Sequence, residues 1–557
     1  MSTAAPLRMI LAGSLLLAAC SSSEPNKTTP LDCAAGAPVS LAVGQFSILD
    51  ASQTACVRIP GGGTAGTEYL YAALATDGTE TQNGVSASYS LHGGQTLTAS
   101  VAPRRPSFSD RAPTAAQAFH DMLRARERDL TARPGAAQLD RTRISASVVP
   151  TPPVVGDQRT FDVCTSTACT DFVQSTATAK VVGNKVAIFL DDAAPAGYSQ
   201  TDLDNIAQLF DAHLYPIDTT AFGRESDLDN NGVVIVLLSQ HINELSPNCN
   251  TTQSVILGYF FGLDLLPSQA HSNDGEIFYG LVPGQITTGC TISKEFATAN
   301  LPSVFIHEFQ HMISFNQHVL VRSGTSEDTW LNEGLSHFAE ELGGRQVPDN
   351  FCQPAFTQCE DEFIGGDIDD AYQYLDDPES NFLIEPGSSS GTLPERGANW
   401  LFVRWLADHF AATQPFGTEL TKALVATNKV GAANVSTVTG EDFSTLVGQW
   451  QLANYLDDLP GFTPSSDRLQ YSSFNFRNTY LLNFNNGVFA KPYPLTPDTA
   501  LSGTYNRTGV LRAGSGRHVL IIQPAGSAEA SFVLKDAGGS TPVSSAVKPR
   551  IALVRVR

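Results

Sequence analysis

Apolar and polar residues alternate along two parts of the chain, one near each end. Between residues 33 and 104, the stretches TEYLYAALATDG and VSASYSLHGG show this alternation between Gly-rich turns. From about residue 466 the pattern returns in NFNNGVF, GRHVLIIQ and RIALVRV, with Asn/Gly turns. A period of two residues is typical of strands that bury one face. We predict a small N-terminal β domain (33–104) and a C-terminal β-sandwich-like domain (466–557).

The middle of the chain mixes short apolar runs with longer periodic ones. KVVGNKVAIFLDD, GVVIVLLS and GEIFYGLV contain continuous apolar runs, as buried strands do. TDLDNIAQLFDAHLYP places apolar residues on one helical stripe, and we expect Thr201 to cap that helix. Further helices are predicted at 302–320, with Pro302 in the first turn, at 327–342, and in GANWLFVRWLADHFA and FSTLVGQWQLANYL. The acidic stretch 345–392 is expected to be rich in loops.

A charged segment, 105–150, separates the first β domain from this mixed core. It contains the amphipathic stretch TAAQAFHDMLRARERDL and the Pro-rich connector VVPTPPVVGD. We interpret it as a linker whose helix packs on one of its neighbours. The mixed core then covers residues 151–465, and a length of 557 residues also favours several domains.

The first twenty residues are typical of a targeting segment. MSTAAPLRMILAGSLLLAAC has a basic residue followed by an apolar run too short to span a bilayer. Its last four residues resemble a bacterial lipobox, which implies that a lipoprotein signal peptide (1–19) is removed and Cys20 is lipidated. A plain signal peptide cut nearby is the alternative. We expect an exported protein, either lipid-anchored to the bacterial cell envelope (outer membrane or cell surface) through Cys20 and a tether (20–32), or secreted.

Cysteine usage and charge narrow the compartment and the partners. Eight of the nine cysteines remain besides Cys20, and an even number suits disulfides in an oxidising compartment. No CxxC spacing points to a metal cluster. The net charge of −22 lacks the basic surface that phosphate binding needs, so nucleic acid is not an expected partner. The predicted disulfides join neighbours in the sequence: Cys33–Cys56, Cys164–Cys169, Cys249–Cys290 and Cys352–Cys359.

The stretch FIHEFQHMIS (305–314) places two histidines four positions apart with a glutamate between them. Positions four apart share one helix face, so His307 and His311 can reach the same ion. Glu308 is offset by about 100° and lies beside that ion. This is the known use of HExxH, which supplies two zinc ligands and a general base. A helix that carries two histidines at a solvated edge is the alternative.

A second predicted helix offers a third ligand. EDTWLNEGLSHFAEELGG begins with acids, ends at a Gly pair and contains Glu333. Glu333 completes a His/His/Glu site that leaves a fourth position open for water. The motifs HEFQHMI and WLNEGLSHFAEE together resemble those of the hyicolysin family of secreted bacterial zinc metallopeptidases, in the gluzincin group that includes thermolysin. The resemblance is close over 301–345, diffuse over 155–410, and does not cover the two end domains.

The resemblance implies an α+β thermolysin-like (gluzincin) metallopeptidase core flanked by small β domains. It also implies a zinc-dependent endopeptidase that hydrolyses protein or peptide substrates outside the cytoplasm. Zinc held by His307, His311 and Glu333 then lowers the pKa of its bound water, which is the nucleophile. Glu308 acts as general base and passes the proton to the leaving amine.

Other activities are weighed against this one. An aminopeptidase needs a group that holds the free amine of its substrate, and no GxMEN-like stretch precedes His307. A catalytically inactive surface lipoprotein, acting as a binding or adhesion module, is the alternative from another class. The intact HExxH residues and Glu333 favour the enzyme.

Several residues near the motif have open roles. His337 lies one turn past Glu333, where thermolysin-like enzymes carry an aspartate. It could replace Glu333 as a ligand or orient one, and Glu340 and Glu341 could also orient a ligand. Related enzymes use a downstream Tyr or His to steady the oxyanion. The candidates here are Tyr372, Tyr374 and His409.

A second candidate metal site lies in SDLDNNGVVIV (226–236). Asp227, Asp229 and Asn231 stand at alternate positions before a glycine, as at the start of a calcium loop. The pattern then fails, because the twelfth position is Leu238 and a strand follows where an EF-hand has a glutamate and a helix. An Asp/Asn/Gly turn that needs no metal is the alternative.

Overall fold

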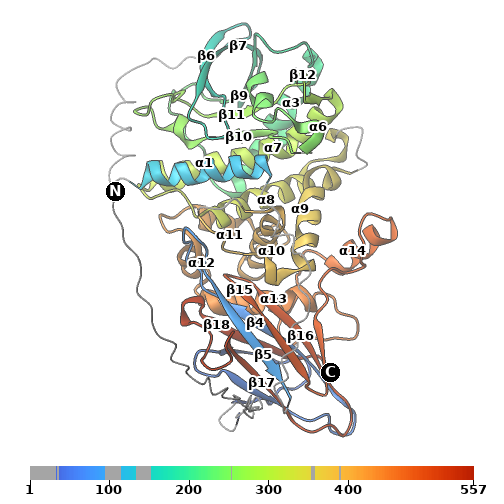
Figure 1. Cartoon of the computed structure of the whole chain (residues 1–557). Helices are drawn as coiled ribbons and strands as arrows, with labels where there is room; N and C mark the ends of the chain where they lie inside the picture. Colours follow the sequence, from blue (N-terminus) through green and yellow to red (C-terminus); the bar gives the residue numbers. More distant parts are fainter. Residues whose placement is uncertain are drawn as a thin grey trace, which may run out of the picture.

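Mixed helices and sheets make up the computed structural model, as the prediction of a multidomain α+β protein requires. The predicted signal peptide, the tether and Cys20 lie outside the residues that it describes. Figure 1 shows three tiers: a sheet with α1 beneath it, a central block of helices, and a strand-rich region at the opposite end. In the described part of the chain, no helix has the length and apolar character needed to cross a membrane. The described residues are Cys33, 37–94, 114–132, 152–252, 254–352, 358–387 and 391–557.

The first tier is a six-stranded sheet in the order β10-β11-β9-β8-β7-β6. The predicted apolar runs form its central strands, and β9 pairs in parallel with both β8 and β11. The short strand β10 pairs antiparallel with β11 and forms one edge. The strands are β6 (Gln158–Cys164), β7 (Phe172–Val182), β8 (Val186–Asp191), β9 (Val234–Leu238), β10 (Gly258–Phe260) and β11 (Ile277–Gly280).

The helices predicted in the first two tiers are present, but two of them begin at other residues than predicted. Ser199 caps α3, not Thr201, because its hydroxyl accepts a hydrogen bond from Asp202 N. Ser293 caps α7, so Pro302 lies inside that helix and not in its first turn. The larger helices are α1 (Ala115–Thr131), α3 (Gln200–Leu209), α7 (Lys294–Phe315), α8 (Thr329–Gln346), α9 (Cys359–Asp376), α10 (Leu393–Phe410) and α13 (Phe443–Leu456). Shorter helices are α4 (Tyr215–Ala221), α5 (Gln240–Glu244), α6 (Cys249–Thr252), α11 (Thr418–Val425) and α12 (Gly431–Thr439).

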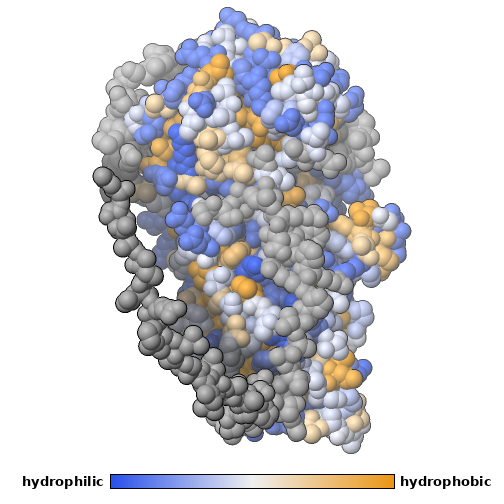
Figure 2. Space-filling view, in the orientation of Figure 1, coloured by the Kyte–Doolittle hydropathy of each residue, from blue (hydrophilic) through white to orange (hydrophobic). Residues whose placement is uncertain are grey.

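Two segments differ in type from their prediction. The acidic stretch 345–392 contains the helix α9, whose first turn holds three acids that suit the positive end of a helix dipole. The segment that includes NFNN was predicted as β, yet Phe476–Asn485 forms α14 because Asn475 caps it. This helix projects from the body of the molecule (Figure 1). Figure 2 shows apolar side chains gathered on the projection, which exposes Leu481, Leu482, Phe484 and Val488.

The third tier is a pair of five-stranded sheets, in the orders β1-β3-β17-β5-β15 and β14-β16-β4-β18-β2. Each sheet contains strands from both ends of the chain, so the two β segments predicted as separate units share one pair of sheets. The N-terminal strands are β1 (Ala37–Pro38), β2 (Phe46–Asp50), β3 (Cys56–Ile59), β4 (Thr67–Ala75) and β5 (Ser86–Gly93). The C-terminal strands are β14 (Asp498–Leu501), β15 (Tyr505–Arg512), β16 (Gly516–Gln523), β17 (Ala530–Asp536) and β18 (Pro549–Arg555).

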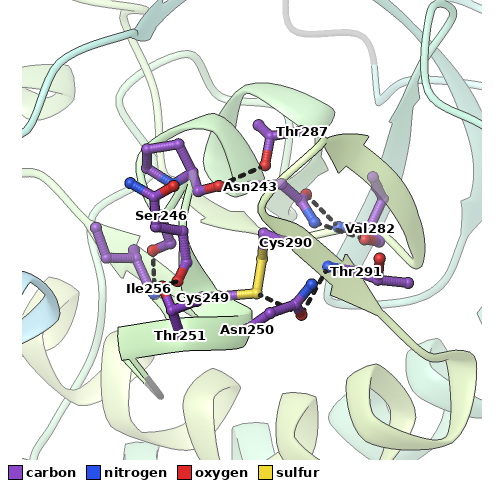
Figure 3. The surroundings of a disulfide bond; sticks show 12 residues. Asn243, Ser246, Cys249, Asn250, Thr251, Ile256, Val282, Thr287, Cys290 and Thr291 are labelled. Atoms are coloured by element: carbon purple, nitrogen blue, oxygen red, sulfur yellow. Dashed lines mark hydrogen bonds between the residues drawn. A yellow bond between two sulfur atoms is a disulfide. The ribbon is translucent and has the colours of Figure 1, made fainter.

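The four predicted disulfides are confirmed. Each pair has Cα atoms between 4.7 and 5.8 Å apart. The bond Cys249–Cys290 joins α6 to β13 (Cys290–Ile292). Figure 3 shows the hydrogen bonds around it, where Thr291 N donates to the side chain of Asn250. Disulfides of this kind are typical of proteins outside the cytoplasm.

Candidate metal centre

Helices α7 and α8 bring the predicted ligands together. The apolar face of α7 is buried in the main core, which leaves His307 and His311 on the side that faces α8. The two Nε2 atoms lie 3.1 Å apart. Glu333 on α8 places Oε2 at 3.6 Å from His307 Nε2 and Oε1 at 3.7 Å from His311 Nε2. The donor atoms of all three residues therefore point to one place between the helices.

This geometry fits a zinc ion. Ligand atoms bound to zinc at about 2.0–2.1 Å in a tetrahedron lie about 3.3 Å apart. Glu333 is 1% exposed, and neither carboxylate oxygen accepts a well-directed hydrogen bond from a described group. Its described partners are the ion pair with Arg396, at 3.1 Å, and the two histidines. Burial raises the pKa of Glu333, but Arg396 and the histidines outweigh it and hold the pKa well below 4.5.

The other nitrogen of each histidine has its own partner. His307 Nδ1 lies 2.7 Å from Glu340 Oε1, and His311 Nδ1 lies 3.1 Å from Asn332 Oδ1. A histidine that donates Nδ1–H to an oxygen keeps Nε2 unprotonated for a metal. Glu340 therefore orients His307, one of the roles that the sequence allowed for it.

His337 and Glu341 take different positions from each other. His337 Nδ1 lies 2.7 Å from Asp367 Oδ1 and 3.1 Å from Glu340 Oε1, so it contacts the partner of His307. Burial lowers the pKa of His337, but Asp367 and Glu340 outweigh it and raise the pKa well above 6.5. Glu341 instead pairs with Arg404 at 2.8 Å, away from the ligands.

Glu308 lies beside the ligands and against the sheet edge. Its Oε2 accepts a hydrogen bond of 2.7 Å from Phe260 N in β10, and its Oε1 lies 3.8 Å from His120 Nδ1. Burial raises the pKa of Glu308 above 4.5, against the opposing effect of the nearby His307 and Arg124. The carboxylate is therefore positioned next to both the metal ligands and a strand edge.

Helix α1 covers this centre. Figure 1 shows it between the sheet and α8, and its side chains contact both. Asp121 pairs with Arg396 at 3.4 Å. Burial lowers the pKa of His120 to about 3, so this imidazole is neutral. The pattern of segment 105–150 predicts a helix within a linker, but the charged residues of α1 carry no signal of what they contact.

The three candidates for an oxyanion donor are engaged elsewhere. The hydroxyl of Tyr372 accepts from Lys491 N, that of Tyr374 accepts from the Gln451 side chain, and His409 contacts Gln470 O. None of their described contacts involves the ligands or Glu308. Arg396 and His120 lie at the centre instead, and no motif in the sequence marks either of them.

Two histidines one helical turn apart, a carboxylate as third ligand and an adjacent glutamate form a site of the kind that metal-dependent hydrolases use. No model of a known protein family matches the chain. Over 140 residues the chain is 31% identical to the neutral metalloprotease ShpI of Staphylococcus hyicus. The match covers 25% of this chain and 30% of that relative's length. It supports a relationship to metallopeptidases.

Proposed function

We propose that this protein is a zinc-dependent endopeptidase of the hyicolysin type with a thermolysin-like core. The observation that carries the proposal is the convergence of His307, His311 and Glu333 beside Glu308. Zinc at this position supplies a Lewis acid that polarises a scissile carbonyl and lowers the pKa of water. The partial likeness to a metalloprotease supports the same reaction class.

The side chains of this chain then have distinct roles. Glu308 takes a proton from the attacking water and gives it to the leaving amine. The hydrogen bond from Phe260 N fixes the orientation of that carboxylate. Glu340 and Asn332 hold the two imidazoles in the tautomer that ligates. Arg124 of α1 binds Phe260 O of the edge strand β10. Without this contact the edge can pair with an extended peptide, which suits an endopeptidase.

We place the protein outside the cytoplasm, where its substrates are proteins or peptides. The four disulfides support this compartment. A lipid on Cys20 that holds the protein at the bacterial envelope is part of the same proposal.

The test is cleavage of an unfolded protein by the zinc-loaded wild type and by Glu308→Gln, with zinc content measured for both. Loss of the general base is expected to lower the rate by about 10²–10⁴-fold while zinc stays bound. Glu295→Gln is the matched control, because Glu295 is exposed on the same helix. A Glu308→Gln variant that holds zinc and cleaves like the wild type rules out this mechanism.

The burial of the centre favours a second candidate, an inactive binding lipoprotein. Glu308 is 2% exposed and His311 is 1% exposed beneath α1. If zinc binds but neither the wild type nor a variant with α1 loosened cleaves any protein, this second function replaces the first.

A further inference from the structure

Three carboxylates converge away from the metal centre, where β9 and β11 begin. Asp227 and Asp229 lie in the loop before β9, and Glu276 directly precedes β11. The two strands pair in parallel, with Ile277 opposite Ile235, so their starts lie side by side. One oxygen from each carboxylate lies within 4.8 Å of the other two.

Glu276 is the most informative member of this group. It is 1% exposed, and its Oε1 accepts a hydrogen bond of 3.0 Å from Leu228 N. Its Oε2 has no well-directed hydrogen bond, and the Ser226 hydroxyl interacts with this carboxylate only at poor geometry. A buried carboxylate oxygen without a well-directed partner costs free energy that a bound cation lowers.

The loop holds its two aspartates in place. Asp227 Oδ1 accepts from Gly232 N, and Asp229 accepts from the main chain and the side chain of Asn231. Asn231 Oδ1 accepts a hydrogen bond from Val233 N. Asn231 therefore positions Asp229 and does not point its oxygen at the three carboxylates. Positive φ angles of 52° at Asn230 and 76° at Gly232 make the turn possible.

The charge of the group is only partly balanced. Arg159 lies 3.6 Å from Asp229 Oδ2, and it is the one basic side chain that forms an ion pair with these carboxylates among the described residues. One arginine faces three carboxylates, of which Glu276 is buried and Asp227 is exposed. Oxygen-only ligands favour a hard cation such as calcium over zinc.

We propose that Asp227, Asp229 and Glu276 bind a calcium ion. Glu276 takes the role of the twelfth-position glutamate that the loop itself lacks at Leu238. Two oxygens bound to one calcium ion at about 2.4 Å lie at most about 4.8 Å apart, and the three carboxylates meet this limit. The site ties the starts of two central strands of the sheet together.

The test is calorimetric titration of Ca²⁺ into metal-stripped protein, together with the thermal midpoint. One bound ion and a raised midpoint are expected for the wild type, and loss of both for Glu276→Gln. Asp227→Asn, at an exposed position, gives the same result without the risk that a buried substitution prevents folding. Asp204→Asn, at another exposed position, is the control and keeps both.

The variant Glu333→Gln separates this site from the zinc site. The variant is expected to bind calcium with the same affinity as the wild type. No heat and no shift of the midpoint in the wild type overturn the proposal. Calcium binding that survives in both Glu276→Gln and Asp227→Asn overturns it as well.

A second inference concerns α1 and rests on the proposed function. Phe260 O accepts a hydrogen bond of 2.6 Å from Arg124, and Gly262 N donates one of 2.7 Å to Glu127. These main-chain groups lie at the end of the edge strand β10 and just after it, next to Phe260 N, which donates to Glu308. A peptide adds to a sheet edge through such groups. Arg124 and Glu127 therefore occupy positions that an extended substrate needs.

We infer that α1 closes the catalytic site and has to move aside before a substrate enters. Two of its arginines hold it from outside the centre. Arg126 donates to Cys169 O, and Arg128 pairs with Glu80 at 2.9 Å. Neither arginine contacts a metal ligand or Glu308 in the described structure, so both can be changed without altering the chemistry.

The test compares the wild type with the double variant Arg126→Ala/Arg128→Ala. Several-fold higher kcat/KM on an unfolded protein is expected, because the open form is more populated. A zinc-binding peptide hydroxamate, titrated into zinc-loaded Glu308→Gln with and without the double change, measures access alone. Equal hydroxamate affinity in both backgrounds overturns the inference. Tighter hydroxamate binding without cleavage by any variant supports closure by α1 and overturns the proposed function instead.

Discussion

The metal centre and the β-sandwich are built in opposite ways. The centre takes its ligands from α7 and α8, which follow each other along the chain. The sandwich places Leu91 of β5 opposite Leu534 of β17, so it joins the two ends of the chain. The first region is encoded by neighbouring segments, while the second exists only when distant segments meet.

The two regions also differ in what they bury. The centre buries charged groups, among them Glu333, Arg396 and Asp367, whereas the sandwich core is apolar. Burying charges is costly, and such groups are typical of functional sites. Substitutions in the centre should therefore alter metal binding and activity, and substitutions in the sandwich should alter the free energy of unfolding.

The largest expected effect comes from ending the chain after residue 497. This deletion removes β14 to β18, which leaves β2, β4 and β5 without partners and β3 with β1 alone. We expect the N-terminal strands not to fold, which limited proteolysis followed by mass spectrometry detects as rapid cleavage within 37–94. Protection of 37–94 in the shortened chain would show that the N-terminal strands form a unit of their own. Supplying residues 498–557 as a separate fragment is the control, and it is expected to restore protection.

In the metal centre, Glu333→Gln is expected to lower kcat/KM more than about 100-fold, the upper end for groups that only orient a ligand. The amide is a poor zinc ligand, so zinc content measured by mass spectrometry should fall with the activity. Glu295→Gln is the control, because Glu295 is exposed on α7. This variant is expected to keep both its zinc content and its kcat/KM. Full zinc occupancy in Glu333→Gln would remove this residue from the ligand set.

A double-mutant cycle on Leu91 and Leu534 tests the sandwich directly. Both are fully buried, and each change to Ala is expected to cost about 2–5 kcal/mol of the free energy of unfolding. Because the two residues lie opposite each other, their effects should couple by about 0.5–3 kcal/mol. Urea unfolding of the four proteins measures this coupling. Additive effects would show that the two side chains do not interact across the strand pair.

The smallest effect is expected for Asp367→Asn. It weakens the contact that holds His337 against Glu340, so zinc affinity should fall about 10–100-fold with little change in folding. Asp369→Asn is the matched control, because Asp369 is exposed on the same helix. A competition titration with a zinc chelator measures the zinc affinities of the two variants. Equal affinities would assign Asp367 a purely structural role.

The sequence was informative wherever a pattern is local. The HExxH spacing and the following helix predicted the grouping of His307, His311 and Glu333, and cysteine neighbours predicted the four disulfides. Apolar runs predicted β8, β9 and β11. In each case the interacting positions lie within one element or in segments close along the chain.

Contacts between distant segments could not be predicted in this way. Glu276 reaches the Asp227 loop only because β9 and β11 pair, and Arg396 reaches Glu333 only because α10 packs beside α8. The alternation that marks β4 says which face is buried, but not that its neighbours are β16 and β18. Asp367 was missed because its helix was interpreted as a loop.

The position of β4 has a consequence for how the protein is made. Both neighbours of this strand, β16 and β18, are synthesised long after it. A chain emerges N-terminus first, so the buried residues of β4 stay uncovered until β16 and β18 have been made. An interrupted product keeps an open sheet edge that other proteins and proteases can reach. The fold therefore discriminates against interrupted synthesis, since only a chain that includes β16 and β18 can cover its first strands.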